Sequence, residues 1–155
     1  MIKIGIDTKN RETVAKHLNV LLANEFALYI KTLKYHWNVV GRDFGPLHKL
    51  FNDQYEELLE IADRVAERVR ALDLQSFGTM KEFSKHATIT EDPGVYPNDM
   101  GMIKKLVADH ETIIRQIRDD ITLTAKLDDM GTNNFLCDLI EKHEKMAWML
   151  RAHVE

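Results

Sequence analysis

Two histidines and two carboxylates in the first half of the chain have the residue types of a transition-metal site. His36 and His48 are followed by Asp63 and Glu67. Neutral imidazole nitrogen and carboxylate oxygen are the ligands that suit first-row metals such as iron and zinc. The sequence therefore contains a candidate metal centre, and the elements that carry these four side chains decide whether it can form.

Three of the four residues fall in one regular helical segment, predicted over residues 44–72. Its apolar residues recur in steps of four and three, which is typical of a bundle helix; they are Phe51, Tyr55, Leu58, Ala62, Val65, Val69 and Leu72. At 1.5 Å per residue, His48 and Asp63 are roughly 22 Å apart along such a helix. Metal–ligand bonds are only about 2.0–2.2 Å long, so one helix cannot bring both residues to the same ion.

Three arrangements remain open for this candidate centre. Two copies of the helix packed antiparallel across a twofold axis would place His48 of one beside Asp63 and Glu67 of the other. Alternatively, the residues form two separate half-sites, or no site at all. In the last case the carboxylates belong to a solvated acidic face that continues upstream through Glu60, with Arg64 as the partner of Glu60 and Arg70 as the partner of Glu67. A ferritin-type site inside one bundle is not expected, because it needs Glu three residues before His, and none of the seven histidines has that neighbour.

The rest of the chain predicts an all-α protein that forms a single domain over residues 1–155. Helical periodicity covers about residues 11–39, 44–72, 98–127 and 134–153, and Gly41 is a plausible stop after the first helix. The connection over residues 73–97 contains a short helical stretch at 80–86. A short loop, a long crossover and a second short loop are the connections of a ferritin-like four-helix bundle.

Composition indicates where the protein is located and which partners it lacks. The net charge is −4, and no apolar run reaches the ~20 residues needed to cross a bilayer. We expect no signal peptide and no membrane partner. The lone Cys137 excludes an intrachain disulfide and fits a reducing compartment, so we expect the cytoplasm.

A specific motif joins these residues and resembles the signature of the Dps mini-ferritins, the DNA-protection-in-starved-cells family. The motif consists of His36, Trp37, Asn38, Val39, Gly41, Phe44, Leu47, His48, Phe51, Tyr55 and an Asp63-x-x-Ala-Glu-Arg segment. The likeness also covers the predicted helices along the whole chain, including the short helix in the crossover.

The resemblance implies a hollow homododecamer built from twofold dimers, with a di-iron ferroxidase centre at each dimer interface. His36 and His48 of one subunit would meet Asp63 and Glu67 of its twofold mate. Fe(II) would be oxidised to Fe(III), preferably with hydrogen peroxide, and stored as a ferric mineral, which protects against oxidative stress. Trp37 resembles a family tryptophan that acts as an electron donor; packing is the alternative role.

Two positions depart from the family pattern. Asn52 stands where the family often has Asp, so we expect a second, weaker iron site to lose negative charge. Before and within the last helix, Asp129 and Asp138 resemble carboxylates that line a threefold iron pore, whereas Asn134 stands where another Asp is common. A weaker attraction of the pore for Fe(II) follows.

Two other functions compete with the ferroxidase. The first is physical coating of DNA, which in the family often relies on a lysine-rich tail. Lys3, Lys9 and Arg11 are the only basic residues near the N-terminus and Asp7 dilutes them, so we do not expect it. The second is a helical interaction module without metal, which explains the apolar repeats but not the ligand types.

Overall fold

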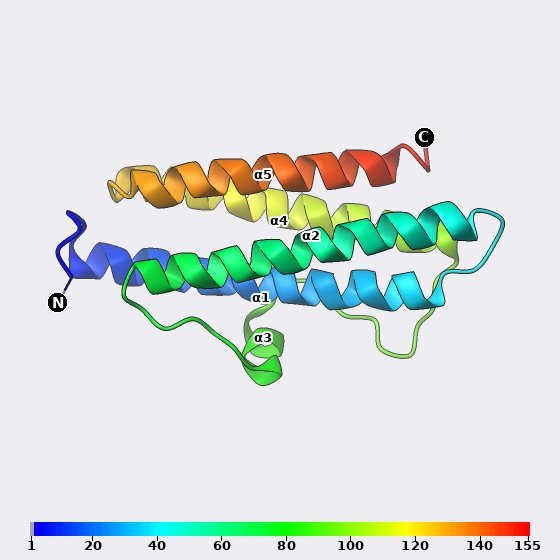
Figure 1. Cartoon of the computed structure of the whole chain (residues 1–155), viewed down its shortest axis with the longest axis horizontal. Coiled ribbons are helices and arrows are strands. Elements are labelled where there is room, and N and C mark those ends of the chain that lie inside the picture. Colours follow the sequence, from blue (N-terminus) through cyan, green and yellow to red (C-terminus); the bar gives the residue numbers. More distant parts are fainter. Residues whose placement is uncertain (1) are drawn as a thin grey trace.

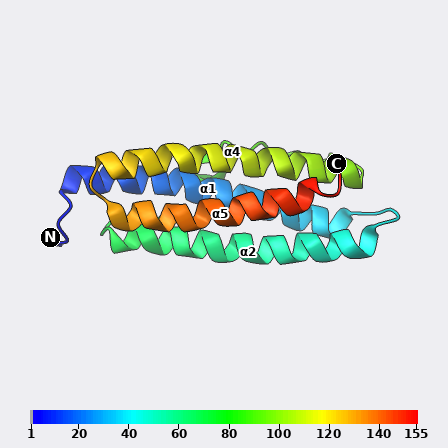
Figure 2. The same ribbon diagram turned by 90° about the horizontal axis from the view of Figure 1, so that it is seen from above.

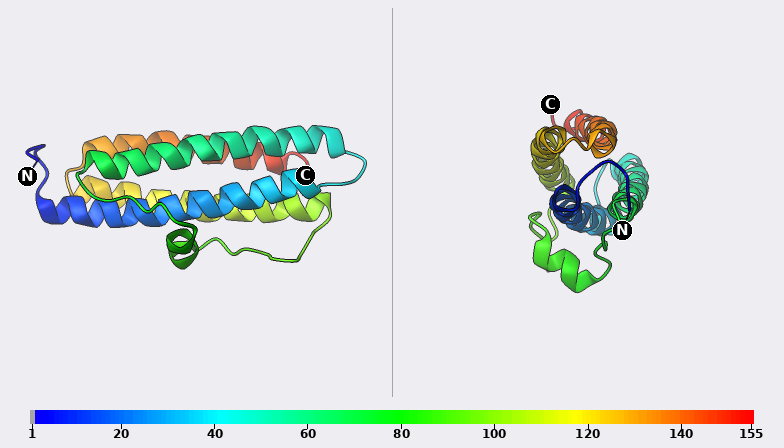
Figure 3. Two further views of the ribbon diagram at one scale, coloured as in Figure 1. Left: turned by 60° about the horizontal axis from the view of Figure 1, so that its bottom comes forward. Right: turned by 90° about the vertical axis from the view of Figure 1, so that its left-hand side faces the viewer.

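The computed structural model describes residues 2–155 and contains five helices in that range: α1 (Thr8–Asn38), α2 (Phe44–Ala71), α3 (Met80–His86), α4 (Asp99–Lys126) and α5 (Met130–Arg151). The four long helices lie side by side as a bundle (Figures 1 and 2). Seen along its axis, the bundle is a square of four helices, with α3 outside it and against α1 (Figure 3). The predicted all-α ferritin-like fold is confirmed.

Side-chain caps fix where the helices begin, and they correct two predicted boundaries. Asp7 accepts a hydrogen bond from the backbone N–H of Asn10 (2.8 Å), so α1 starts at Thr8 rather than near residue 11. Asp129 accepts from the backbone N–H of Thr132 (2.9 Å), so α5 starts at Met130 rather than near residue 134. The loop between α4 and α5 is therefore shorter than predicted, because this cap holds residues 130–133 in helical conformation.

The helix over 80–86 begins and ends as predicted. Thr79 and Glu82 form a reciprocal capping box, in which each side chain accepts a hydrogen bond from the other residue's backbone N–H. Phe83 is the buried residue of this short helix. The crossover therefore carries its own anchored turn of helix against α1.

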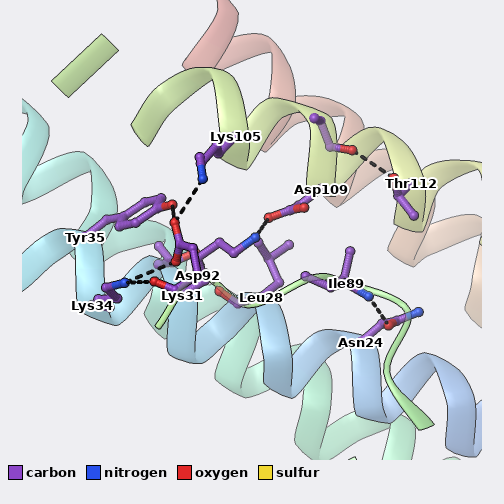
Figure 4. A network of polar contacts seen from close by, with 12 residues as sticks. Asn24, Leu28, Lys31, Lys34, Tyr35, Ile89, Asp92, Lys105, Asp109 and Thr112 are labelled. Carbon is purple, nitrogen blue, oxygen red and sulfur yellow. Dashed lines mark hydrogen bonds and ion pairs between the residues drawn. The ribbon is translucent and has the colours of Figure 1, made fainter. Parts of the chain in front are cut away.

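The end of the crossover is held against the bundle by Asp92 (Figure 4). Its carboxylate accepts hydrogen bonds from the Tyr35 hydroxyl (2.6 Å) and from the ammonium groups of Lys34 (3.1 Å) and Lys105 (3.2 Å). Burial alone raises the pKa of Asp92, but these three hydrogen bonds together outweigh it and hold that pKa below its usual value. Because Tyr35 precedes His36, this network also fixes the end of α1 that carries the first candidate ligand.

Asn24 pins the middle of the crossover to the same helix. Its amide oxygen accepts from the backbone N–H groups of Thr88 (2.7 Å) and Ile89 (3.2 Å), and its amide nitrogen donates to Gln116 (2.7 Å). Asn24 is fully buried, so each of these hydrogen bonds satisfies a group that water does not reach. α1 is thus the element on which the crossover and α4 are both positioned.

The apolar core runs the length of the bundle and includes six of the seven repeat residues predicted on α2; only Tyr55 is half-buried. The core also contains a polar cluster made of Glu25, His110 and His143, all fully buried. No helix of residues 2–155 is long and apolar enough to cross a membrane.

Candidate metal centre

The α1–α2 corner brings His36 and His48 face to face. α1 ends when Val39 turns to an extended conformation, and Gly41 takes a φ of 131°, which favours glycine. α2 then starts at Phe44 and runs back along α1. As a result the two imidazole rings stack with centroids 3.8 Å apart and planes 15° apart.

Both rings are held by backbone rather than by side chains. Nδ1 of His36 lies 2.7 Å from the carbonyl oxygen of His48, and Nδ1 of His48 lies 2.8 Å from the carbonyl oxygen of His36. A carbonyl only accepts, so each Nδ1 carries the proton and donates. In this tautomer the lone pair lies on Nε2, the nitrogen available to a metal.

Asp63 and Glu67 lie about one helical turn apart further along α2, and both carboxylates are exposed. Within residues 2–155, neither makes a side-chain hydrogen bond or an ion pair. The alternative partners are engaged elsewhere: Arg64 pairs with Asp138 (2.8 Å), and Arg70 donates to the carbonyl of Leu74. Both carboxylates are therefore open to solvent and unpaired within the subunit.

A single chain does not bring the four residues together. In the part of the chain that the structure describes, no three His, Cys, Asp or Glu side chains are grouped so that they could hold a metal ion. Between His48 and Asp63 lie about four turns of a straight helix, roughly 22 Å. The two nitrogen donors lie at one end of α2 and the two oxygen donors lie toward the other end. Neither pair by itself is a complete metal site.

Asn52 and Trp37 flank the histidine pair in different ways. Asn52 lies one turn after His48, and its amide oxygen accepts a hydrogen bond from the Tyr55 hydroxyl (2.8 Å). The Trp37 side chain is 68% exposed and points away from the packed interior of the subunit. Packing within its own subunit therefore does not account for Trp37.

The three candidate pore residues differ in accessibility. Asp129 is buried: besides capping α5 it accepts from the Thr132 hydroxyl and pairs with Arg68 (3.1 Å). Both carboxylate oxygens of Asp129 are engaged in these contacts. Asp129 therefore has a structural role in α5, and neither oxygen is free to bind a passing cation. Asn134 and Asp138 are exposed on α5.

Two features of this region were not identified from the sequence. The carbonyl anchors of the histidine pair have no side-chain signal at all. The sequence places Tyr55 in the apolar repeat and in the family motif but predicts no contact with the histidines. In the structure it is half-buried, and its ring meets the His36 ring edge-on, with centroids 5.2 Å apart.

The other histidines form contacts away from this pair. Nε2 of His143 lies 2.8 Å from Glu25, and Nδ1 of His143 lies 3.0 Å from Nδ1 of His110. Glu25 was missed, although a lone acid within an apolar stretch of α1 was a signal for it. His17 is exposed on α1, and its Nδ1 lies 2.7 Å from the Asp120 carboxylate of α4.

Comparison with known proteins places these features in a family. Residues 15–155 match the ferritin-like domain family. An uncharacterized low temperature-induced protein of Nostoc sp. is 44% identical over 155 residues, covering 99% of this chain and 87% of that protein. A DNA protection during starvation protein of Listeria innocua is 33% identical over 149 residues, covering 96% of this chain and 92% of that protein.

Solved structures agree with the sequence matches. A Dps protein from Vibrio cholerae O1, described as a member of a superfamily of ferritin-like diiron-carboxylate proteins, superposes with a TM-score of 0.95 at 32% identity, covering 100% of this chain and 97% of that one. Dps from Thermosynechococcus elongatus gives a TM-score of 0.91 at 32% identity, covering 96% and 94% of the two chains. The chain therefore belongs to the Dps family of ferritin-like proteins, a family of iron storage and DNA protection.

Proposed function

We propose that this protein is a ferroxidase and iron store whose centre is shared by two subunits. His36 and His48 of one subunit bind Fe(II) together with Asp63 and Glu67 of the twofold partner. The iron is oxidised to Fe(III), with hydrogen peroxide as the preferred oxidant, and is kept as a ferric mineral inside a hollow homododecamer. Iron is here the substrate and the cargo, and its removal limits oxidative stress.

One observation carries the proposal. The two histidines present unblocked Nε2 atoms at one end of α2, whereas the two carboxylates lie unpaired toward the other end. Two α2 helices packed antiparallel across a twofold axis join each incomplete half to the complementary half of the partner. Imidazole and carboxylate together form a ligand set for iron.

Subunit mixing tests whether the centre is shared. His48→Ala and Asp63→Ala each disable both centres of a homodimer. A mixed dimer of the two variants has one centre with both defects and one intact centre. With random assortment half of the dimers are mixed, so about one quarter of the centres recover. Co-expressed variants should therefore oxidise Fe(II) with peroxide, whereas each variant alone should not.

The result separates a shared centre from one within a single chain. In a one-chain centre every subunit of the mixture is defective, so no activity returns. Size-exclusion chromatography with light scattering on both variants and on the mixture is the control, since all three must assemble alike. Failure of a well-assembled mixture to recover activity would contradict the shared centre.

The shell and its pore follow from the same proposal. We place Asn134 and Asp138 in the threefold pore, because both are exposed and the ion pair of Asp138 with Arg64 uses only one carboxylate oxygen. We leave Asp129 out, because it is buried and both of its oxygens are used within the subunit. We also propose a cytoplasmic location, the reducing compartment that suits the unpaired Cys137.

Physical coating of DNA is the weaker candidate. Of the basic residues near the N-terminus, Arg11 is buried and donates to the carbonyl of Leu72 (2.9 Å), and Lys9 lies in the first turn of α1. A gel-shift series at rising salt tests it; a shift that persists at moderate salt would restore this function, because phosphate contacts alone weaken steeply with salt.

A further inference from the structure

Three ionisable side chains that the candidate metal centre does not use lie buried in the subunit core. Glu25 on α1, His110 on α4 and His143 on α5 are all fully buried. Nε2 of His143 lies 2.8 Å from a Glu25 carboxylate oxygen, and Nδ1 of His143 lies 3.0 Å from Nδ1 of His110. These three residues, the buried triad, link three helices of the bundle through two hydrogen bonds.

No other charged group takes part in the buried triad within residues 2–155. On α2 the buried side chains are apolar except for the neutral Gln54. The residues on either side of Glu25 carry no charge. The charged residues next to His110 and His143 pair with other side chains: Asp109 with Lys31, Glu111 with Arg151, Lys142 with Glu57, and Glu144 with Arg118. The protonation of the triad therefore depends on its own three members.

The contact between the two histidines can hold only one hydrogen. A hydrogen bond needs one donor and one acceptor, so one Nδ1 carries the hydrogen and the other offers a lone pair. The ionised carboxylate of Glu25 only accepts, so Nε2 of His143 carries a hydrogen too. A further proton goes first to His143, because the neighbouring carboxylate stabilises its positive charge. His143 then donates from both nitrogens, and His110 is the neutral acceptor.

A proton on His110 as well breaks this arrangement. Both Nδ1 atoms then carry hydrogens that face each other across 3.0 Å, on two positively charged rings. Nε2 of His110 is buried without a hydrogen-bond partner, so turning the ring over offers no alternative. Burial, and then His143, accordingly hold the pKa of His110 well below its usual value. The closed core therefore excludes this proton, whereas a core opened to water accepts it.

We propose that the buried triad is an acid-sensitive latch between α4 and α5. At neutral pH one shared hydrogen joins His110 to His143 and keeps the two helices in contact. Release begins below about pH 6.5, where a histidine exposed to water takes up a proton and the open form is favoured. The opening should stay local, because the Asn133 amide donates to the Ile121 carbonyl (2.7 Å) and holds the helices together near their connecting loop. The latch involves no iron, so it stands apart from the proposed ferroxidase function.

Hydrogen–deuterium exchange with mass spectrometry on the whole, iron-free protein tests the latch between about pH 7 and pH 5. The exchange of each peptide is corrected for the intrinsic rate of amide exchange at that pH. Opening of peptides that cover residues 106–114 and 139–147 should then increase by up to about tenfold per pH unit below pH 6.5, which is the slope for uptake of one proton. Peptides that cover residues 121–133 and α2 should not follow this increase.

Two variants separate the latch from a general effect of acid. His110→Gln removes the titrating ring and keeps a neutral polar side chain, so its exchange should no longer increase in acid. His17→Gln makes the same change at an exposed histidine that joins α1 to α4 through Asp120, and it should respond as the parent does. If His110→Gln does not fold, the slope measured in the parent decides alone. The latch would be overturned by a parent without an acid response, by equal opening of all helices, or by an unchanged response in folded His110→Gln.

Discussion

His36 and His48 anchor one another through their backbones: Nδ1 of each ring donates to the carbonyl oxygen of the other residue, at 2.7 and 2.8 Å. Because the acceptors are backbone atoms, replacing one side chain leaves the anchor of the other ring in place. The corner between α1 and α2 therefore sets both tautomers before any metal arrives.

This relationship predicts that either histidine can be removed without loss of fold. His36→Ala or His48→Ala should weaken Fe(II) binding by more than the roughly 10–100-fold that loss of an outer-shell partner costs, because a direct ligand is lost. Anaerobic titration with Fe(II), monitored by calorimetry, measures this loss of affinity. His86→Ala, a matched change on α3, should leave the affinity unchanged; an equal loss there would remove the assignment.

Asn52→Asp should strengthen the second iron site. An added carboxylate close to a divalent ion contributes more than about 1.4 kcal/mol, so the second ion should bind at least about tenfold more tightly. Co(II) titration monitored by its visible spectrum counts the bound ions. Asn134→Asp adds the same charge away from the centre and is the control, since a similar gain in both would indicate only a general charge effect.

Asp129→Ala should destabilise the protein and leave iron uptake intact. It removes the cap of α5, which costs about 0.5–2 kcal/mol, and leaves Arg68 without its ionic partner. Thermal unfolding and stopped-flow Fe(II) uptake measure the two effects. Asp138→Ala is the comparison: it should have little effect on stability and should slow uptake, and the reverse pattern would return Asp129 to the pore.

Buried His110, which contacts His143, should make stability depend on pH. Burial, and then the neighbouring His143, hold the pKa of His110 well below its usual value. The unfolded chain therefore binds the proton first, so this contribution is complete above about pH 6.5 and is lost as the pH falls toward the folded-state pKa. The loss should approach about 1.4 kcal/mol per pH unit.

Denaturant unfolding of the parent and of His110→Leu between pH 5 and pH 7 checks this, because the difference between the two curves isolates the residue. The charged and titratable neighbours are His143, which contacts His110 directly, and Glu25 behind it. Parallel curves for the two proteins would show that His110 does not titrate in this way.

Asp92 should also lose its contribution to stability in acid, but here the charged form of the side chain is the stabilising one. Its lowered pKa favours the ionised form in the folded protein, so its contribution is present above the unfolded value of about 3.9 and is lost as the pH falls through the folded-state pKa. Asp92→Asn should cost about 1–3 kcal/mol at neutral pH and flatten the acid limb of the stability curve. Asp53→Asn, an exposed carboxylate paired with Lys49, should change either by far less.

The sequence alone determined the fold class and the division of the candidate centre. Apolar repeats on α2 and the short helix at 80–86 depend on local spacing, so they were predictable. The rise of a helix was enough to separate His48 from Asp63. The start of α5 was not found, because it depends on whether the Asp129 side chain turns back to the Thr132 N–H.

Only the tertiary structure decided how the centre is prepared. The carbonyl anchors of the histidine rings arise where α1 and α2 meet, and they involve backbone atoms that every residue possesses. The edge-on contact of Tyr55 with His36 likewise depends on the packing of two helices whose partners are distant in the chain. Residue types and spacing define which ligands exist, whereas the approach of separate helices defines which atoms of those ligands remain free.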